Sequence, residues 1–237
     1  TVTLYEGDAN NDDTVNSADV AVLKGSYWEA LGETSFRPGA DFNEDDYIDA
    51  KDASLLGANF FLGGPMPGAG LLAVTPALRF FASSTSVDVG DIVTVTVAIE
   101  TGGTKVQAVD LFVRYDPQFL RVVDETGAQT TAAIPVTDTL GIVLKNQVDL
   151  SDGVISYAAL SATDYTPGSY VDVMRVRFRA MRPTTEQGAL LEFLDNPGTR
   201  RISRLCVDGY DVLKNRYDEA ITIDGTTMWL PYIARNG

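Results

Sequence analysis

Histidine is absent from the chain, and Cys206 is its only cysteine. A single cysteine cannot close an internal disulfide, and without histidine the chain lacks the usual base that activates a catalytic Cys or Ser. We expect Cys206 to be a small, buried hydrophobic side chain. Long apolar runs are also absent, since no stretch approaches the ~20 consecutive apolar residues that a membrane-spanning helix needs.

Basic residues are scarce, because 18 Lys and Arg stand against 33 Asp and Glu and give a net charge of −15. A chain this acidic is repelled by the phosphates of nucleic acids. The acidity is concentrated in residues 1–64, where 13 acidic and 3 basic residues give −10; the other 20 acidic and 15 basic residues give −5. The 237 residues, 45% of them hydrophobic, suit one large domain or two smaller ones.

The acidic part contains one twelve-residue pattern twice, at residues 8–19 and 41–52. In each copy, oxygen-bearing side chains occupy positions 1, 3, 5, 9 and 12, and position 7 offers a backbone carbonyl. Calcium binds 6–8 oxygen ligands, and a loop with this spacing wraps around it. Asp- and Asn-rich segments also form simple turns, but two matching copies favour two calcium sites. The predicted ligands are Asp8, Asn10, Asp12, Thr14, Asn16 and Asp19, then Asp41, Asn43, Asp45, Tyr47, Asp49 and Asp52.

Two positions within the loops carry further expectations. Position 6, where such loops usually have Gly for a left-handed turn, is Asp13 or Asp46, and this should lower calcium affinity. Position 8 is apolar in both copies, as Val15 and Ile48. We expect these two residues to face each other in a short β contact.

Each loop leads into one predicted helix. The first helix should continue to Leu31 and end at Gly32, and Ala53, Leu56 and Phe60 mark the second. Helix breakers within residues 32–40 leave no room for the entering helix of an EF-hand. The apolar residues at helical spacing in the first helix are Val20, Leu23, Tyr27 and Leu31.

This duplicated loop–helix unit resembles a dockerin module over residues 4–62. The resemblance implies two bound calcium ions and docking onto a cohesin module. The partner-contacting positions of the family fall on Ser17, Ala18, Lys24 and Gly25, and on Ala50, Lys51, Gly57 and Ala58. The alternative is that these residues are merely exposed on the helices. The two sets differ at Ser17 against Ala50 and at Lys24 against Gly57, which argues against two equivalent docking orientations.

From residue 71 onward the pattern is typical of β structure, after a Gly/Pro-rich linker at residues 63–70. Short alternating or β-branched segments are separated by turn signals such as SDG and DNPG, so we predict an all-β sandwich at residues 71–224. The predicted strand segments are residues 91–100, 106–124, 153–161, 170–181, 189–194 and 219–224.

Several of these segments resemble a cohesin module: a strand running into Tyr115-Asp116-Pro117, an aromatic strand opened by Gly153, and the strand VMRVRFRA. The resemblance implies a nine-stranded jelly-roll sandwich with one flat face that binds a dockerin. Asp110 matches a dockerin-facing Asp of the family, and alternation places it with Phe112, opposite Val109 and Leu111. The alternative is a solvent-exposed strand residue.

Residues 225–237 form an apolar tail that contains Trp229, Leu230, Tyr232 and Ile233 and is too short to cross a bilayer. Two interpretations stay open. The tail is either an extra segment packed on one of the domains or a docking and attachment segment.

The sequence therefore predicts two domains, a small all-α calcium-binding domain at residues 1–62 and the jelly-roll sandwich. We predict a non-catalytic adaptor in an extracellular, cellulosome-like assembly, secreted or associated with the cell surface. Its dockerin half would bind a cohesin and its cohesin half a dockerin, and the two halves could also bind each other within or between chains.

Two other functions are possible for a chain with these features. Glycosidases need two carboxylates across a cleft, but many of the acidic residues lie in the calcium loops and there is no nucleophile motif, so we expect no enzyme. The other is a calcium-stabilised carbohydrate-binding sandwich, which requires exposed, coplanar aromatic rings. The candidates for such rings are Phe80, Phe81, Tyr165 and Tyr170.

Overall fold

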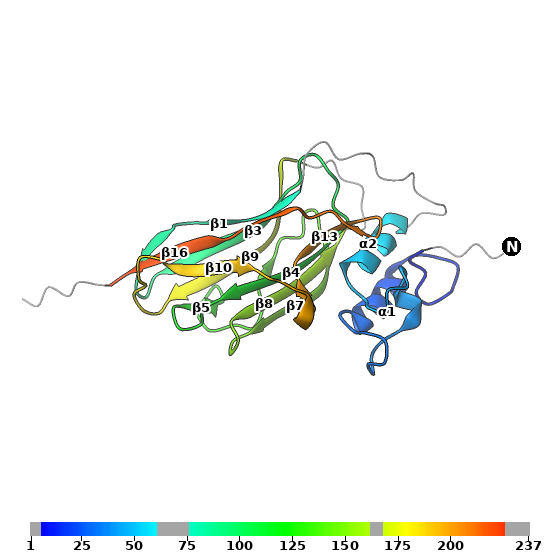
Figure 1. The fold of residues 1–237 in the computed structure, drawn as a ribbon, viewed down its shortest axis with the longest axis horizontal. Coiled ribbons are helices and arrows are strands. Elements are labelled where there is room, and N and C mark those ends of the chain that lie inside the picture. Colours follow the sequence, from blue (N-terminus) through cyan, green and yellow to red (C-terminus); the bar gives the residue numbers. More distant parts are fainter. Residues whose placement is uncertain (1–5, 61–75, 162–167, 226–237) are drawn as a thin grey trace, which may run out of the picture.

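The computed structural model describes residues 6–60, 76–161 and 168–225. Figure 1 shows a small helical unit at one end of a larger β-sandwich. We call residues 6–60 the loop–helix domain and residues 76–225 the sandwich. The predicted linker at 63–70 and the tail beyond Gly225 lie outside the described residues. None of the described helices is both long and apolar enough to span a membrane.

The loop–helix domain contains two ten-residue helices, α1 (Ser17–Ser26) and α2 (Ala50–Asn59), and a 3-10 turn, η1 (Pro38–Ala40). Each helix begins with a capping box, in which the N-cap side chain accepts a backbone hydrogen bond and the third helical residue bonds back to the N-cap backbone. The N-cap residues are Asn16 and Asp49. The same acidic repeat therefore both forms a loop and starts a helix.

The first helix is shorter than predicted. It ends at Ser26, because Tyr27 is extended and Trp28 takes a left-handed conformation with φ 66°. Leu31, which we placed on the buried face of this helix, is 62% exposed. The apolar spacing in the sequence continues beyond the end of the helix. Tyr27 and Trp28, where the helix ends, contact the sandwich rather than continuing the helix.

The contact between the two loops also differs from expectation. The backbone of Ile48 pairs with the segment after α1, since Trp28 N–H donates to the Ile48 carbonyl at 2.8 Å and Ile48 N–H to the Glu29 carbonyl at 3.0 Å. Val15 and Ile48 are both buried in one hydrophobic cluster. Their side chains thus share a core, while the β pairing of Ile48 involves residues 28–29.

The sandwich consists of two main sheets, which confirms the predicted all-β class. The first sheet has the order β15-β1-β3-β9-β5, with β6 also paired to β9. Its strands are β1 (Ala77–Ala82), β3 (Ile92–Glu100), β5 (Leu120–Val123), β6 (Ile134–Pro135), β9 (Tyr170–Ala180) and β15 (Asn215–Tyr217).

The second sheet has the order β14-β13-β4-β10-β16-β2, and β8 pairs with both β4 and β7. A small ribbon, β11 (Asp195–Asn196) with β12 (Arg201–Ile202), flanks η2 (Pro197–Thr199). The strands of the second sheet are β2 (Ser86–Asp88), β4 (Ala108–Tyr115), β7 (Ile142–Asp149), β8 (Val154–Leu160), β10 (Ala189–Phe193), β13 (Arg204–Val207), β14 (Tyr210–Asp211) and β16 (Glu219–Asp224).

Strand β4 shows how alternation divides the core between the sheets from the outer face of the second sheet. Val109, Leu111 and Val113 belong to the core between the two sheets. Ala108 and Phe112 belong to separate clusters on the other side of the strand, with Asp110 between them in sequence. The predicted division of β4 into two faces is therefore confirmed, and Asp110 lies on the outer face.

The outer face of the second sheet is continuous with the core of the loop–helix domain. One buried cluster joins Leu23, Ile48 and Leu56 of the loop–helix domain to Leu160 and Cys206 of the sandwich. Cys206 is fully buried there, as expected for a small hydrophobic residue. The two units thus share an apolar contact rather than being joined only through the linker.

Candidate docking interface and calcium loops

The two acidic loops fold alike because position 1 of each binds the backbone of the turn. The Asp8 carboxylate accepts hydrogen bonds from Asp12 N–H at 3.1 Å and Asp13 N–H at 2.9 Å. The Asp41 carboxylate accepts them from Asp45 N–H at 3.1 Å and from Asp46 N–H at 3.0 Å. These bonds curl each loop around its own acidic side chains.

Position 12 closes each loop. The Asp19 carboxylate accepts hydrogen bonds from Asn10 N–H at 3.1 Å and Asn16 N–H at 2.8 Å. Asp52 makes the corresponding bonds with Asn43 N–H at 3.3 Å and Asp49 N–H at 2.9 Å. Position 12 therefore connects both ends of the loop to the first turn of the helix.

Position 6 takes the conformation that normally favours glycine. Asp13 and Asp46 both have φ 65°, in the left-handed region that is uncommon for residues with a side chain. Asp tolerates this region better than most residues, at some conformational cost. The feature occurs in both loops, so the two repeats have the same backbone turn despite the missing glycine.

The donor atoms in each loop suit a hard cation. They are carboxylate, amide and backbone carbonyl oxygens, which are the ligands that calcium prefers. Within the described ranges, no group of three or more His, Cys, Asp or Glu side chains is placed to hold a metal by itself. Beside its carboxylates, each loop offers an amide oxygen at position 3 and a backbone carbonyl oxygen at position 7, which are also oxygen donors of the kind calcium accepts.

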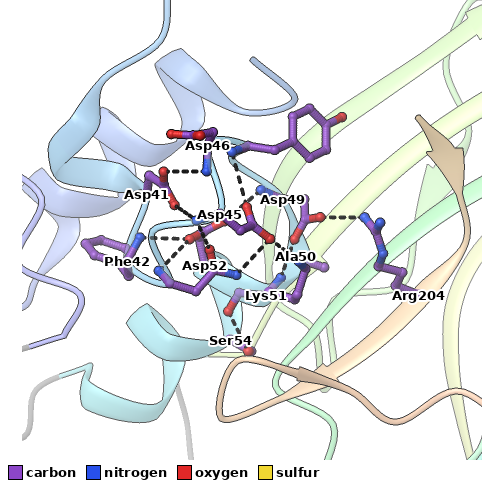
Figure 2. A network of polar contacts seen from close by, with 12 residues as sticks. Asp41, Phe42, Asp45, Asp46, Asp49, Ala50, Lys51, Asp52, Ser54 and Arg204 are labelled. Carbon is purple, nitrogen blue, oxygen red and sulfur yellow. Dashed lines mark hydrogen bonds and ion pairs between the residues drawn. The ribbon is translucent and has the colours of Figure 1, made fainter. Parts of the chain in front are cut away.

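Cations of the protein lie beside the second loop. Figure 2 shows Lys51 paired with Asp45 within the loop and Arg204 of β13 paired with Asp49. The Arg204 Nη1 and Asp49 Oδ2 atoms are 2.5 Å apart. Burial raises the pKa of the Asp49 carboxyl, and the Arg204 guanidinium opposes that rise. Burial also raises the pKa of Asp52 to about 7. The second loop is thus partly enclosed by the sandwich, and the Asp49 carboxylate at loop position 9 contacts a residue of the other domain.

Helix α2 lies against β4, β8 and β13, so the second repeat forms most of the contact (Figure 1). A Cβ added to Gly57 would lie 2.7 Å from the Ser161 carbonyl oxygen, which shows how closely the helix approaches the sheet. The Ser54 hydroxyl accepts a 2.8 Å hydrogen bond from Gly209 N–H. A side chain larger than hydrogen at position 57 would push the helix away from the sandwich.

Asp110 is the polar centre of this contact and is fully buried. Its carboxylate accepts hydrogen bonds from the Tyr27 hydroxyl at 3.0 Å, the Trp28 Nε1–H at 3.2 Å and the Ala50 N–H at 3.1 Å. The Ala50 donor lies at the N-terminus of α2, where the helix dipole favours an anion. Burial, reinforced by the charge of Asp49 and opposed by that of Arg204, raises the pKa of Asp110 to about 7.

The first repeat contributes two further contacts. The Trp28 ring packs on Phe112 with the ring centroids 5.0 Å apart. The Lys24 ammonium donates a 3.1 Å hydrogen bond to the Val143 carbonyl of β7. Both repeats therefore touch the same sheet, and Asp110 accepts hydrogen bonds from both.

The structure brings together some of the residues predicted from the sequence as partner contacts and separates others. Asp110, Ala50, Gly57 and Lys24 meet at the interface. Ala58 is buried, and Lys51 pairs within its own loop. Ser17 and Ala18 are exposed, and a Cβ added to Gly25 would have nothing within 4 Å.

Sequence reasoning missed several residues of the interface. Tyr27 and Trp28 fitted a pattern of core residues, and Ser54 resembled an ordinary polar helix position. One signal in the sequence could have identified the aromatic pair. The second repeat has Phe60-Phe61 where the first has Tyr27-Trp28, so only the first repeat carries a hydroxyl and an indole N–H at these positions. No local motif distinguished Arg204.

The aromatic residues suggested for sugar binding do not form a platform where the structure describes them. Phe80 is buried and stacks on Phe193, with the ring centroids 4.1 Å apart. Phe81 and Tyr170 are exposed, but their rings meet edge to face at 87°. Tyr165 lies outside the described residues. No flat, coplanar surface is formed by the described members of this set.

Comparisons with known proteins agree with this architecture. Residues 6–60 match the family model for the dockerin type I domain, and residues 80–199, just over half of the chain, match that for the cohesin domain. No curated protein sequence matches the chain significantly.

Solved structures show the same sandwich. A type II cohesin domain from the cellulosome of Acetivibrio cellulolyticus is 20% identical with a TM-score of 0.51, over 62% of this chain and 95% of that one. The second type II cohesin module of the adaptor ScaA scaffoldin of the same organism is 17% identical with a TM-score of 0.51, over 62% and 89%. Type II cohesin A11 from Bacteroides cellulosolvens is 14% identical with a TM-score of 0.51, over 62% and 99%. At these identities the likeness establishes the fold.

Proposed function

We propose that this chain, which belongs to the cohesin family and carries a dockerin type I domain ahead of its cohesin domain, is a non-catalytic adaptor that works through calcium-dependent docking. Cohesin and dockerin domains are scaffolding modules without catalytic function. Their order along the chain is the one predicted from the sequence. The single observation that carries the proposal is the burial of Asp110 beneath donors from both repeats of the dockerin domain.

As an adaptor, the protein would join two partners. Its dockerin domain takes a cohesin, and its cohesin domain takes a dockerin. An assembly of this kind belongs outside the cell, where such modules form cellulosome-type scaffolds. The likeness to a cohesin of an adaptor scaffoldin is consistent with this role.

Type I dockerin domains bind calcium, and we propose one ion for each loop. The matching hydrogen-bond pattern of Asp8 and Asp41 supports two similar sites. A bound ion would neutralise the closely spaced carboxylates and hold the loop in the shape that starts the helix. Through Asp49 and Ala50, the second loop also orders the part of α2 that meets the sandwich.

The experiment that tests the calcium part is calorimetric titration of the calcium-free full-length protein. We expect two ions per chain. Asp8→Ala together with Asp12→Ala should remove one ion, and Asp41→Ala together with Asp45→Ala the other. The matched control is Asp138→Ala with Asp152→Ala in the sandwich, which should leave the stoichiometry unchanged. Absence of calcium binding by the parent protein would contradict the proposed function.

Docking itself can be followed by the fluorescence of Trp28, which packs on Phe112 and bonds to Asp110. The chain has two tryptophans, so Trp229→Phe makes Trp28 the only reporter. We expect calcium chelation to shift its emission to longer wavelength, because the indole leaves the interface for water. Unchanged emission after chelation would argue against calcium-dependent docking.

A further inference from the structure

We propose that this chain is its own docking partner: the loop–helix domain closes on the sandwich of the same chain in one orientation, and so masks both docking surfaces until it opens. The inference rests on the proposed function. It adds that the partner of the loop–helix domain is the sandwich of the same chain, and that this contact regulates access to both docking surfaces. It follows from the contacts of Asp110 and from differences between the two repeats at the interface.

The contacts that close the structure join residues far apart in one chain. Asp110 accepts hydrogen bonds from Tyr27 and Ala50, which lie 83 and 60 positions before it. The same helix face that would meet another cohesin is covered by β4, β8 and β13. A second dockerin cannot reach Asp110 while this contact persists, because the carboxylate is fully buried.

The covalent connection favours this internal contact over an external one. Residues 61–75 alone separate the loop–helix domain from the described start of the sandwich. A short connection of this kind gives an effective concentration on the order of millimolar. A partner present at much lower concentration binds only if its intrinsic affinity exceeds that of the internal contact by a corresponding factor.

The orientation is set by polar groups that only one repeat carries. The two repeats are offset by 33 positions in the sequence. If the loop–helix domain docked in the reversed orientation, each residue of one repeat would therefore occupy the place of its counterpart 33 positions away. Phe60 would then replace Tyr27 and bring no hydroxyl to Asp110. Asn16 would replace Asp49 and lose the ion pair with Arg204, and Ala21 would replace Ser54 and lose the acceptor for Gly209 N–H.

The steric fit at Gly57 also favours the observed orientation over the reversed one. Gly57 sits where an added Cβ would lie 2.7 Å from the Ser161 carbonyl oxygen and 3.9 Å from the Gln107 Cβ. Its counterpart in the first repeat is Lys24. Turning the domain over would force a lysine side chain into this space. The reversed arrangement therefore loses these three polar contacts and gains a clash. It also loses the contacts of the Trp28 indole N–H and the Lys24 ammonium, whose counterparts are Phe61 and Gly57.

Gly57→Lys provides the test, because it places the counterpart residue in the tight position. The atoms near the added Cβ all belong to the sandwich, so the loop–helix domain itself should still fold and bind calcium. Lysine is also a better helix former than glycine. The matched control is Ala21→Lys, which adds the same side chain to an exposed position on α1.

The measurements use the full-length chain with Trp229→Phe, saturated with calcium, over a wide range of protein concentration. Trp28 emission reports docking, and X-ray scattering reports particle size. We expect the parent protein and Ala21→Lys to be compact monomers, with Trp28 partly buried against Phe112 at every concentration. Gly57→Lys should lower the ratio of closed to open chains about tenfold or more, as expected for insertion into a packed contact.

Each of the other possible outcomes would contradict a specific part of the proposal. Concentration-dependent assembly of the parent protein would show docking between chains, which overturns self-docking and leaves the adaptor function intact. Exposed Trp28 at all concentrations, with two calcium ions bound, would show that this dockerin does not recognise this cohesin. A closed Gly57→Lys chain would overturn the single orientation. Failure of the proposed function is distinct, because it appears as loss of calcium binding in the parent protein.

Discussion

The Tyr27 hydroxyl donates a 3.0 Å hydrogen bond to Asp110 Oδ1 and so links the end of α1 to the outer face of β4. Both residues are buried, at 1% and 0% exposure. The bond joins the two domains at a point from which water is excluded. Its strength therefore bears directly on whether the domains stay together.

Tyr27→Phe should weaken docking while leaving the fold of each domain intact. The substitution removes only the hydroxyl. Above the Asp110 pKa of about 7 this hydroxyl bonds to a charged carboxylate, and such a hydrogen bond contributes about 1.5–3 kcal/mol. We expect a corresponding shift toward the open form, measured by Trp28 emission in the Trp229→Phe background. Tyr170→Phe, an exposed residue on β9, is the control and should change nothing. An equal effect of both substitutions would contradict the role given to Tyr27.

Asp110→Ala should open the interface more completely than Tyr27→Phe. It leaves the Tyr27 hydroxyl, the Trp28 indole N–H and the Ala50 N–H facing an apolar surface, and each buried donor without a partner costs about 1–3 kcal/mol. The sandwich should keep its stability, because Asp110 faces away from the core between the sheets. Thermal unfolding monitors the sandwich and Trp28 emission monitors docking. A loss of sandwich stability as large as the loss of docking would argue that Asp110 is chiefly structural.

Calcium removal should unfold the loop–helix domain and spare the sandwich. The loop–helix domain has few core residues of its own and many closely spaced carboxylates, so the free energy of metal binding contributes directly to its folding. The sandwich has a separate core between its two sheets. Far-UV circular dichroism of the full chain should lose helical signal on addition of EDTA and keep its β signal. Retention of the helical signal would contradict calcium-dependent folding.

The sequence predicted the duplicated loop–helix unit, which the match of residues 6–60 to the dockerin type I domain confirms, because ion coordination fixes residue types at fixed positions; the individual calcium ligands stay a prediction. Alternation in β4 likewise placed Asp110 and Phe112 on the outer face, opposite Val109 and Leu111, since a strand turns successive side chains to opposite sides. These features depend on local geometry. A short stretch of sequence is enough to specify them.

Features that depend on contacts distant in sequence escaped prediction. Helical spacing carried the first helix on to Leu31, but Trp28 takes a left-handed conformation and packs on Phe112. An apolar pattern does not distinguish a residue packed in its own domain from one packed against another. Arg204 pairs with Asp49 across 155 positions, and neither neighbourhood in the sequence indicates the other.

Tyr157→Phe should stabilise the sandwich or leave it unchanged. The Tyr157 hydroxyl is buried and has no hydrogen-bond partner among the residues that the structure describes, and its ring lies in the core between the sheets. Burial raises the pKa of this hydroxyl to about 12, which reflects the same loss of water. Removing an unsatisfied buried hydroxyl while keeping the ring should gain up to about 1 kcal/mol. Denaturant unfolding in calcium measures the change, with Tyr115→Phe as a second buried tyrosine for comparison. A destabilisation of about 1 kcal/mol or more by Tyr157→Phe would show that the hydroxyl has a partner in solution, such as a bound water.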